Sequence, residues 1–286
     1  MPLDIKSQFD PATKTVSYVL IDPETRQAAI IDSVLDFDAK AGRTSTVSAE
    51  KLIETVQSAG ATVDYILDTH VHADHMTAAQ FLKSELGGAV CIGNQVGKVQ
   101  KTFADIFNLG PDFPTDGSHF DRLLADGEKL SLGEYEIEVL SVPGHTPACS
   151  AYKVGDAIFT GDTIFMPDFG SARCDFPNGD ARTLYKSVRR LLSYPDNTRL
   201  FLCHDYGPGG RDFIWETTVA QQNAENIHIN ATVDEEAFVK FRTERDATLN
   251  APDLILPSVQ VNIRAGHLPE PEANGIAYLK IPLNGL

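Results

Sequence analysis

Three histidines and an aspartate stand within six positions of this 286-residue chain. His72 and His75 follow His70 after two and five residues, and Asp74 lies between His72 and His75. Imidazole and carboxylate groups at this spacing suit a metal ion better than any role in a hydrophobic core. We therefore expect the chain to fold so that one turn presents these side chains to a metal.

The residues around this cluster predict a turn between a strand and a helix. Residues 63–67 form an apolar run that is typical of a core strand. Residues 77–86 have a helical pattern, which ends at Gly87 and Gly88. Because a strand-to-helix turn directs successive side chains into one space, we expect the side chains of this cluster to face the same metal site.

Three more polar side chains follow predicted strands. They are His145 after residues 134–142, Asp162 after residues 157–160 and His204 at the end of residues 200–203. Each alone is readily explained as a turn residue or a buried hydrogen-bonding group, but their shared position at strand ends favours metal ligation. His119, His228 and His267 have no such context and are expected at the surface.

Strands and helices alternate along the rest of the chain. Further strands are predicted over residues 16–21, 28–32, 89–92 and 151–154, several of them paired as hairpins. Helices are predicted over residues 48–60, 95–107, 181–193, 216–226 and 235–247, and the proline-rich tail from Asn250 is predicted to be irregular. This mixture favours an α/β (α+β) fold with two mixed β-sheets and helices on their outer faces, over a doubly wound parallel sheet.

Charge and cysteine content narrow the classes of function. The chain carries 24 Lys and Arg against 40 Asp and Glu, and the net charge of −16 disfavours binding to nucleic acid or to anionic membranes. We expect no membrane span, because no apolar stretch approaches about 18 residues, and no signal peptide, because the first residues lack its pattern. The four cysteines lack CxxC spacing, so a cytoplasmic protein with reduced, buried thiols is expected.

Together, the His70–His75 cluster, His145, Asp162 and His204 resemble the seven-ligand set of the metallo-β-lactamase superfamily. The resemblance covers about residues 10–230. It implies an αββα sandwich with metal at the edge of the two sheets, in a single domain over residues 1–286 whose last part, about 227–286, is an extension packed on it. By this resemblance one metal site uses His70, His72 and His145, the other uses Asp74, His75 and His204, and Asp162 bridges them.

Within that superfamily, the segment Gly161–Phe176 resembles the bacterial glutathione persulfide dioxygenases, which are related to the ethylmalonic encephalopathy protein. The tail segment Leu256–Arg264 has the same resemblance. It implies one iron(II) per chain, held by His70, His145 and Asp162 in an arrangement that leaves positions open for O₂ and substrate. The implied reaction oxidises glutathione persulfide with O₂ and water to glutathione and sulfite, which is a sulfide-detoxifying activity. The remaining ligands, His72, Asp74, His75 and His204, then form a second site or orient the first by hydrogen bonds.

Other residues receive roles from the same resemblance. Tyr206 is expected near the iron as a catalytic residue. Arg173 and Asp175 are both expected in the substrate-binding loop, where Arg173 either pairs with Asp175 or holds a glutathione carboxylate, and Arg264 is a further candidate for substrate binding. Cys174 is interpreted as a passive buried thiol, because nothing in the sequence lowers its pKa.

Two alternative functions stay open. The same seven ligands serve a binuclear zinc thioester hydrolase of the glyoxalase II kind, so the ligands alone do not decide between iron and zinc. A metal- or persulfide-sensing binding protein is the non-enzymatic alternative. A homodimer is kept as an expectation for the assembly.

Overall fold

The computed structural model describes residues 2–285. The strands in this part of the chain are β1 (Asp4–Asp10), β2 (Thr15–Ile21), β3 (Gln27–Ile31), β4 (Val34–Asp38), β5 (Arg43–Ser45), β6 (Thr62–Leu67), β7 (Met76–Thr77), β8 (Ala89–Gly93), β9 (Arg122–Leu124), β10 (Lys129–Leu132), β11 (Tyr135–Ser141), β12 (Ser150–Val154), β13 (Ala157–Phe159), β14 (Arg199–Phe201) and β15 (Glu216–Thr218). The helices are α1 (Val47–Ser58), α2 (Ala79–Leu86), α3 (Val96–Ile106), α4 (Ala181–Leu191), α5 (Val219–Glu225), α6 (Glu235–Asp246) and α7 (Ile255–Asn262), with short 3₁₀ helices η1 (Gly161–Thr163) and η2 (Pro208–Gly210).

The first large sheet has the strand order β1-β2-β3-β6-β8-β9. Strands β1, β2 and β3 pair as antiparallel hairpins, whereas β3, β6, β8 and β9 run parallel. Parallel neighbours need crossover connections, and α1, α2 and α3 lie within those crossovers. The carboxyl ends of these parallel strands therefore meet at one edge of the sheet.

The second large sheet has the strand order β10-β11-β12-β13-β14-β15. Its pairs are antiparallel except β13 with β14, which run parallel and are connected through α4. A small sheet with the order β5-β4-β7 lies beside the turn that follows β6. Both large sheets are mixed, as the sequence predicts.

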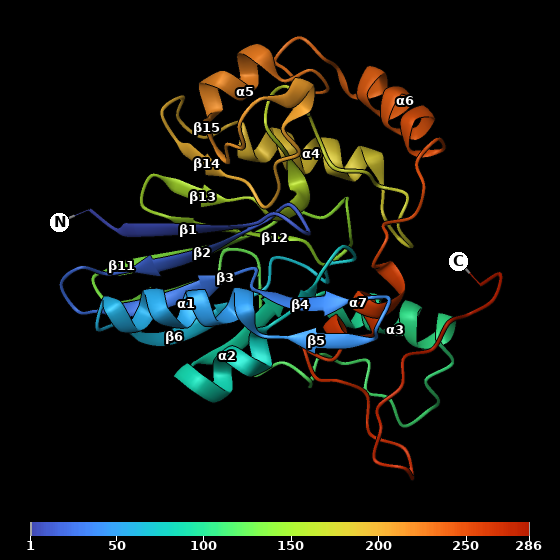
Figure 1. Ribbon diagram of the computed structural model, residues 1–286. Coiled ribbons are helices and arrows are strands. Elements are labelled where there is room, and N and C mark those ends of the chain that lie inside the picture. The colour runs from blue at the N-terminus through green and yellow to red at the C-terminus, as the bar shows by residue number, and fades with distance from the viewer. Residues whose placement is uncertain (1, 286) are drawn as a thin grey trace.

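The two large sheets face each other, and helices cover their outer faces (Figure 1). The apolar layer between the sheets includes Tyr18, Ile31, Val139, Phe159 and Phe201. One outer layer joins the first sheet to α1, α2, α3 and α7, and the other joins the second sheet to α4, α5 and α6. This αββα layering confirms the fold expected from the resemblance to the metallo-β-lactamase superfamily.

The tail and the segment before α5 differ from the sequence prediction. The tail was expected to be irregular from Asn250 onward, but Ile255–Asn262 forms α7. Pro257 stands in the first turn of this helix, where its missing N–H costs no intrahelical hydrogen bond. The helix predicted from residue 216 starts only at Val219, because residues 216–218 pair with β14 as an edge strand and Thr218 caps α5.

The last part of the chain, predicted as an extension from about residue 227, packs on both outer layers. Phe238 of α6 joins the apolar layer of α4, while Ile255 and Val259 of α7 join that of α1 and α2. All four cysteines are buried and none has a disulfide partner. Among residues 2–285, no helix has the length and apolar character needed to cross a membrane.

Candidate metal centre and its cavity

The seven expected ligands come from four segments at one end of the two sheets. The turn of residues 68–75 follows β6, His145 follows β11, Asp162 lies in η1 after β13, and His204 follows β14. Strands β11, β13 and β14 run in the same direction, so their carboxyl ends point the same way. The topology thus brings polar residues that are 134 positions apart, His70 and His204, to one place.

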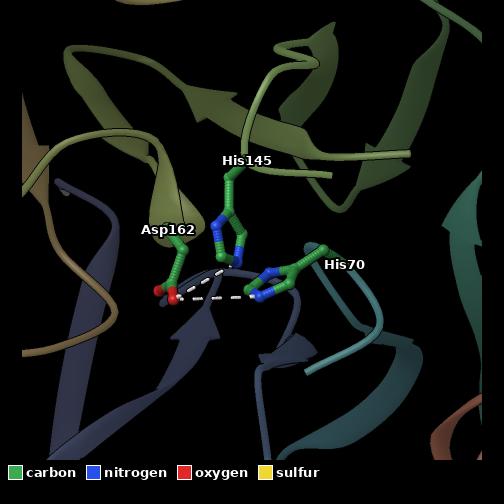
Figure 2. Close-up of side chains that lie close together, drawn as sticks. All are labelled: His70, His145 and Asp162. Carbon is green, nitrogen blue, oxygen red and sulfur yellow. Dashed lines mark ion pairs between the residues drawn. The ribbon is translucent and has the colours of Figure 1, made fainter. Parts of the chain in front are cut away.

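His70, His145 and Asp162 converge on one point (Figure 2). Asp162 Oδ2 lies 3.9 Å from His70 Nε2 and 3.9 Å from His145 Nε2. The three ligand atoms all lie within 4.8 Å of one another, and all three residues are buried. Two imidazoles and one carboxylate therefore face a common space.

The other four expected ligands form a second cluster beside the first. His72, Asp74 and His75 make one group of ligand atoms within 4.8 Å of one another. His204 Nε2 lies 3.2 Å from Asp74 Oδ2 and 3.3 Å from Asp162 Oδ1. Asp162 thus places one carboxylate oxygen beside each cluster.

A metal ion fits these residues, because several of the buried atoms that face the shared space make no hydrogen bond. The buried side-chain atoms without a hydrogen bond include His70 Nε2, His72 Nδ1, His75 Nε2, His204 Nε2 and Asp162 Oδ1. A buried polar atom without a partner is costly, and five of them pointing into one space would be hard to retain without a ligand. The chemistry of the set, imidazole and carboxylate, is that of zinc and non-haem iron sites.

The second ring nitrogen of these histidines is held by the protein. His145 Nδ1 donates to the Arg173 carbonyl at 2.7 Å, and His204 Nδ1 donates to the Lys14 carbonyl at 3.1 Å. Such bonds fix the tautomer, so that the other nitrogen presents its lone pair toward the shared space. The donor set is therefore oriented before any ligand binds.

Asp32 holds two of the histidines in place, His72 by a direct hydrogen bond and His70 through the Thr69 hydroxyl. Its Oδ1 accepts from His72 Nε2 at 3.0 Å and from the Thr69 amide at 2.7 Å. Its Oδ2 accepts from the Thr69 hydroxyl at 2.9 Å, and that hydroxyl in turn accepts from His70 Nδ1 at 3.0 Å. Asp32 directly follows β3, and no local pattern in the sequence marks it as a residue of the site.

Burial sets the charge state of His70 and His72, the two histidines that Asp32 holds. It lowers the pKa of His70 and of His72 well below the usual value, and neighbouring imidazoles lower both further. Both rings are therefore neutral at pH 7, which is the form that binds a metal. Burial also raises the pKa of the Asp162 carboxyl, although His204 and His145 oppose this effect.

A cavity of about 980 Å³ opens onto the cluster. Asp74, His75, His145 and Asp162 are among the residues that line it. The rest of the lining includes four aromatic residues and four arginines, together with five aspartates; these are Phe165, Phe169, Phe176, Tyr206, Arg43, Arg173, Arg242, Arg245, Asp10, Asp36, Asp38, Asp168 and Asp253. This volume lies at the upper end of small-molecule sites, which span about 300–1,000 Å³.

The sequence model of the Metallo-beta-lactamase superfamily matches residues 12–204, a span that contains all seven expected ligands. The chain belongs to the metallo-β-lactamase superfamily. A probable metallo-hydrolase of Burkholderia pseudomallei is 54% identical over 294 residues, covering 99% of this chain and 100% of that protein. Glyoxylase B2 of Dictyostelium discoideum is 50% identical over 286 residues, covering 99% of this chain and 97% of that protein.

The resemblance to persulfide dioxygenases is also found. The mitochondrial persulfide dioxygenase ETHE1 of Bos taurus is 28% identical over 268 residues, covering 93% of this chain and 89% of that protein. The crystal structure of ETHE1 from Myxococcus xanthus is 29% identical, with a TM-score of 0.74, and covers 93% of this chain and 100% of that one. The resemblance thus extends well beyond the metal ligands, although the more similar relatives carry other names.

Of the other expected site residues in this superfamily member, Tyr206 and Arg173 line the cavity. Tyr206 is 42% exposed and stacks on Phe169, with ring centroids 4.5 Å apart. Arg173 binds both oxygens of Asp175 at 2.6 Å and donates to the Asn250 carbonyl at 2.6 Å. Of the two alternatives raised for Arg173, the structure therefore contains the pairing with Asp175.

Arg264, the third residue expected to bind substrate, is not brought to the cavity. Its guanidinium lies over the ring of Phe113, 4.8 Å from the centroid, and donates to the Gln260 carbonyl. Arg264 is absent from the residues that line the described cavity. The structure gives this side chain no contact with the metal cluster.

His228 was expected at the surface but is half-buried and lines the cavity. Its Nδ1 accepts a hydrogen bond from the Ser171 amide at 3.0 Å. Arg242, buried beside it, donates to the Ser171 carbonyl at 3.1 Å. The segment that follows Asp162 is thus clamped from α6 and the loop before it, a contact that a lone histidine in the sequence does not signal.

Cys174 behaves as the passive thiol that the sequence suggested. Burial raises the pKa of its thiol, and the neighbouring Asp246 carboxylate raises that pKa further. A thiol protonated at neutral pH is a poor nucleophile. The structure therefore gives no support to persulfide exchange at Cys174.

Proposed function

We propose that this protein is an iron-dependent persulfide dioxygenase that converts glutathione persulfide, O₂ and water into glutathione and sulfite. The observation that carries the proposal is the buried group of His70, His145 and Asp162, whose ligand atoms lie within 4.8 Å of one another. Two histidines and one carboxylate are the ligand set of many non-haem iron(II) oxygenases, which keep further positions open. The likeness to ETHE1 proteins over 93% of the chain supports the same activity.

Iron(II) bound by this triad would supply the redox chemistry that O₂ requires. The chain's own contribution is to hold the ligand nitrogens in one tautomer and to bind the substrate in the cavity. Phe165, Phe169 and Tyr206 form an aromatic wall next to the metal cluster, which limits access of bulk water to it. Tyr206 is the proposed catalytic residue of this wall, because its hydroxyl can hydrogen-bond to a substrate lying in the cavity.

The proposed substrate is anionic, whereas the chain has a net charge of −16, so binding needs local cations. Arg173 and Arg242 of the cavity wall pair with Asp175 and Asp246. In the described part of the chain, Arg43 and Arg245 line the same cavity without an ion pair. We therefore assign the glutathione carboxylates first to these two arginines, ahead of Arg173 or Arg264.

Replacing Arg245 by alanine is expected to raise the KM for glutathione persulfide and to leave kcat nearly unchanged. A charge-assisted hydrogen bond contributes about 1.5–3 kcal/mol when buried, and Arg245 is exposed, so we expect a rise of roughly three- to tenfold. Steady-state oxygen uptake at several persulfide concentrations measures both constants. An unchanged KM at low ionic strength would remove Arg245 from the substrate site.

Replacing Arg173 by alanine is expected to act mainly on kcat, with metal content mostly retained. The change breaks the pair with Asp175 and the bond to Asn250, which brace the loop whose Arg173 carbonyl holds His145. We expect a loss of roughly tenfold or more, in the range found for residues that orient metal ligands. Oxygen uptake and iron content of the purified variant test this, and wild-type kinetics would show that Arg173 is only a surface charge.

A binuclear zinc thioester hydrolase of the glyoxalase II kind is the second candidate. The second cluster of His72, Asp74, His75 and His204 favours it, because its three histidines each have a buried ring nitrogen without a hydrogen bond. The 50% identity to a protein named Glyoxylase B2 favours it as well. In that case two zinc ions per chain would serve thioester hydrolysis without any use of O₂.

Anaerobic purification followed by elemental analysis separates the two candidates. The same preparation is then assayed for oxygen uptake with glutathione persulfide and for hydrolysis of S-lactoylglutathione. One iron per chain with oxygen uptake and sulfite production supports the dioxygenase. Two zinc ions per chain, thioester hydrolysis and no oxygen uptake would overturn it, while turnover no higher than that of free iron would favour a metal- or persulfide-sensing protein.

The remaining expectations belong to the same proposal. We propose that the chain is a single domain over residues 1–286 with an extension from about residue 227, that it acts in the cytoplasm, and that it forms a homodimer. Size-exclusion chromatography with light scattering tests the homodimer, and limited proteolysis tests the domain boundary.

A further inference from the structure

Helix α7 places a buried asparagine directly against the turn that carries the histidine cluster. Asn262 is 2% exposed. Its Nδ2 donates to the carbonyls of His72 and His75, each at 2.8 Å, and its Oδ1 accepts from the Thr77 amide at 2.9 Å. One side-chain amide therefore satisfies three backbone groups of a segment that lies 185 to 190 residues earlier in the chain.

These three hydrogen bonds matter because the residues of the turn belong to no β-strand. Residues 68–75 lie between β6 and the two-residue strand β7, and they contain four of the seven expected ligands. The His72 and His75 carbonyls find their side-chain donor in Asn262. Since a buried backbone group without a partner is costly, the amide of Asn262 selects one conformation of the turn.

The helix that carries Asn262 is itself held firmly. Ile255, Val259 and Ile263 are buried in the apolar layer of the first sheet. Gln100 of α3 donates to the Ile263 carbonyl at 2.9 Å, and Gln80 of α2 donates to the Ala265 carbonyl at 3.1 Å. Asn262 therefore has a fixed position from which to orient the turn.

We propose that Asn262 is a positioning residue of the metal centre, which sets the backbone of the His70–His75 turn so that its side chains meet the metal in one geometry. The inference rests on the metal centre of the proposed function and holds for iron or zinc. It gives the segment beyond residue 204, where the match to the superfamily model ends, a part in the site. Asn262 acts through the turn and does not touch the substrate.

The test measures metal affinity in two variants and a matched control. Asn262→Ala removes all three bonds, whereas Asn262→Asp keeps the shape but sets a carboxylate oxygen against the two carbonyl oxygens. Gln260→Ala is the control, because Gln260 lies on the same helix, is equally buried, and makes three bonds to Leu256 and Lys280 instead of the turn. Iron(II) affinity under nitrogen and zinc(II) affinity are both measured by competition with a chelator.

We expect Asn262→Ala to lower the affinity for iron(II) and for zinc(II) by about 10- to 100-fold, the usual range for residues that orient metal ligands. Asn262→Asp should bind both metals more weakly still, although aspartate is closer in shape to asparagine than alanine is. Gln260→Ala should lower the midpoint of urea unfolding of the metal-free protein but change either affinity by less than about twofold, well below that range. Asn262→Ser, which keeps one donor, is measured if the other Asn262 variants fail to fold, and its affinity should fall between wild type and that range.

Equal losses of affinity in the Gln260 and Asn262 variants would overturn the inference, because the effect would then be one of general stability. Wild-type affinity in Asn262→Ala or Asn262→Ser would overturn it as well. Oxygen uptake is not part of this measurement. A protein that shows the expected affinities without oxidising persulfide would therefore contradict the proposed function and leave the positioning role intact.

Discussion

Replacing His145 by alanine is expected to abolish both iron retention and oxygen uptake with glutathione persulfide. His145 Nε2 and His70 Nε2 each lie 3.9 Å from Asp162 Oδ2, so the change removes one of three converging ligands. The two that remain cannot form the two-histidine, one-carboxylate site that holds iron(II). Activity should fall to the level of free iron, and the iron content of the purified protein should fall with it.

The control for this prediction is His119→Ala. His119 is half-buried and makes a side-chain hydrogen bond with Gln100, but it does not line the cavity. Its removal should leave iron content and oxygen uptake close to those of the wild type. Elemental analysis and oxygen-electrode measurements on both variants decide the matter, and a His145→Ala protein that keeps its iron and its activity would contradict the assignment.

Replacing Asp32 by alanine is expected to cost stability and metal affinity together. The change leaves the Thr69 amide, the Thr69 hydroxyl and His72 Nε2 without their acceptor in a buried site. Breaking such a network costs about 3–5 kcal/mol, and the freed imidazoles of His70 and His72 lose their fixed orientation. Urea unfolding of the metal-free protein and metal titration measure the two effects.

The variant Asp32→Asn distinguishes the loss of the hydrogen-bond network from the strain that alanine introduces into the backbone at this position. Asp32 has a φ of 52°, a conformation that costs alanine about 1–2 kcal/mol but that asparagine tolerates. The asparagine keeps one acceptor oxygen for Thr69 and places an NH₂ group where the second acceptor was. We expect it to be more stable than Asp32→Ala but weaker in metal binding than wild type; wild-type stability and affinity in both variants would show that Asp32 does not support the site.

Much of the fold could be read from neighbouring residues. The β2–β3 and β12–β13 hairpins lie where short apolar runs flank short polar segments, and α4 buries Leu184, Val188 and Leu191 as its spacing predicts. The failures came where local pattern and tertiary pairing compete. Residues 216–218 pair with β14 instead of starting a helix, and α7 forms despite its proline.

The residues of the site, like the elements of the fold, were predictable where a local pattern in the sequence marks them. Position at strand ends predicts metal ligation for His145, Asp162 and His204, the resemblance to the dioxygenases implies the triad of His70, His145 and Asp162, and the structure brings these three residues together. His228 and Arg264 were misjudged, since neither has a local signal that tells a cavity residue from one packed elsewhere.

The sequence by itself determined the donor types, their spacing and the strand ends on which they stand, because these depend on residues only a few positions apart. The tertiary structure alone decided which partners orient those donors. Asp32 and Asn262 lie 40 and 190 residues from His72, and no pattern in the chain links them. Contacts at such separations exist only once the two sheets and α7 have packed, because burial then leaves each polar group few partners within reach.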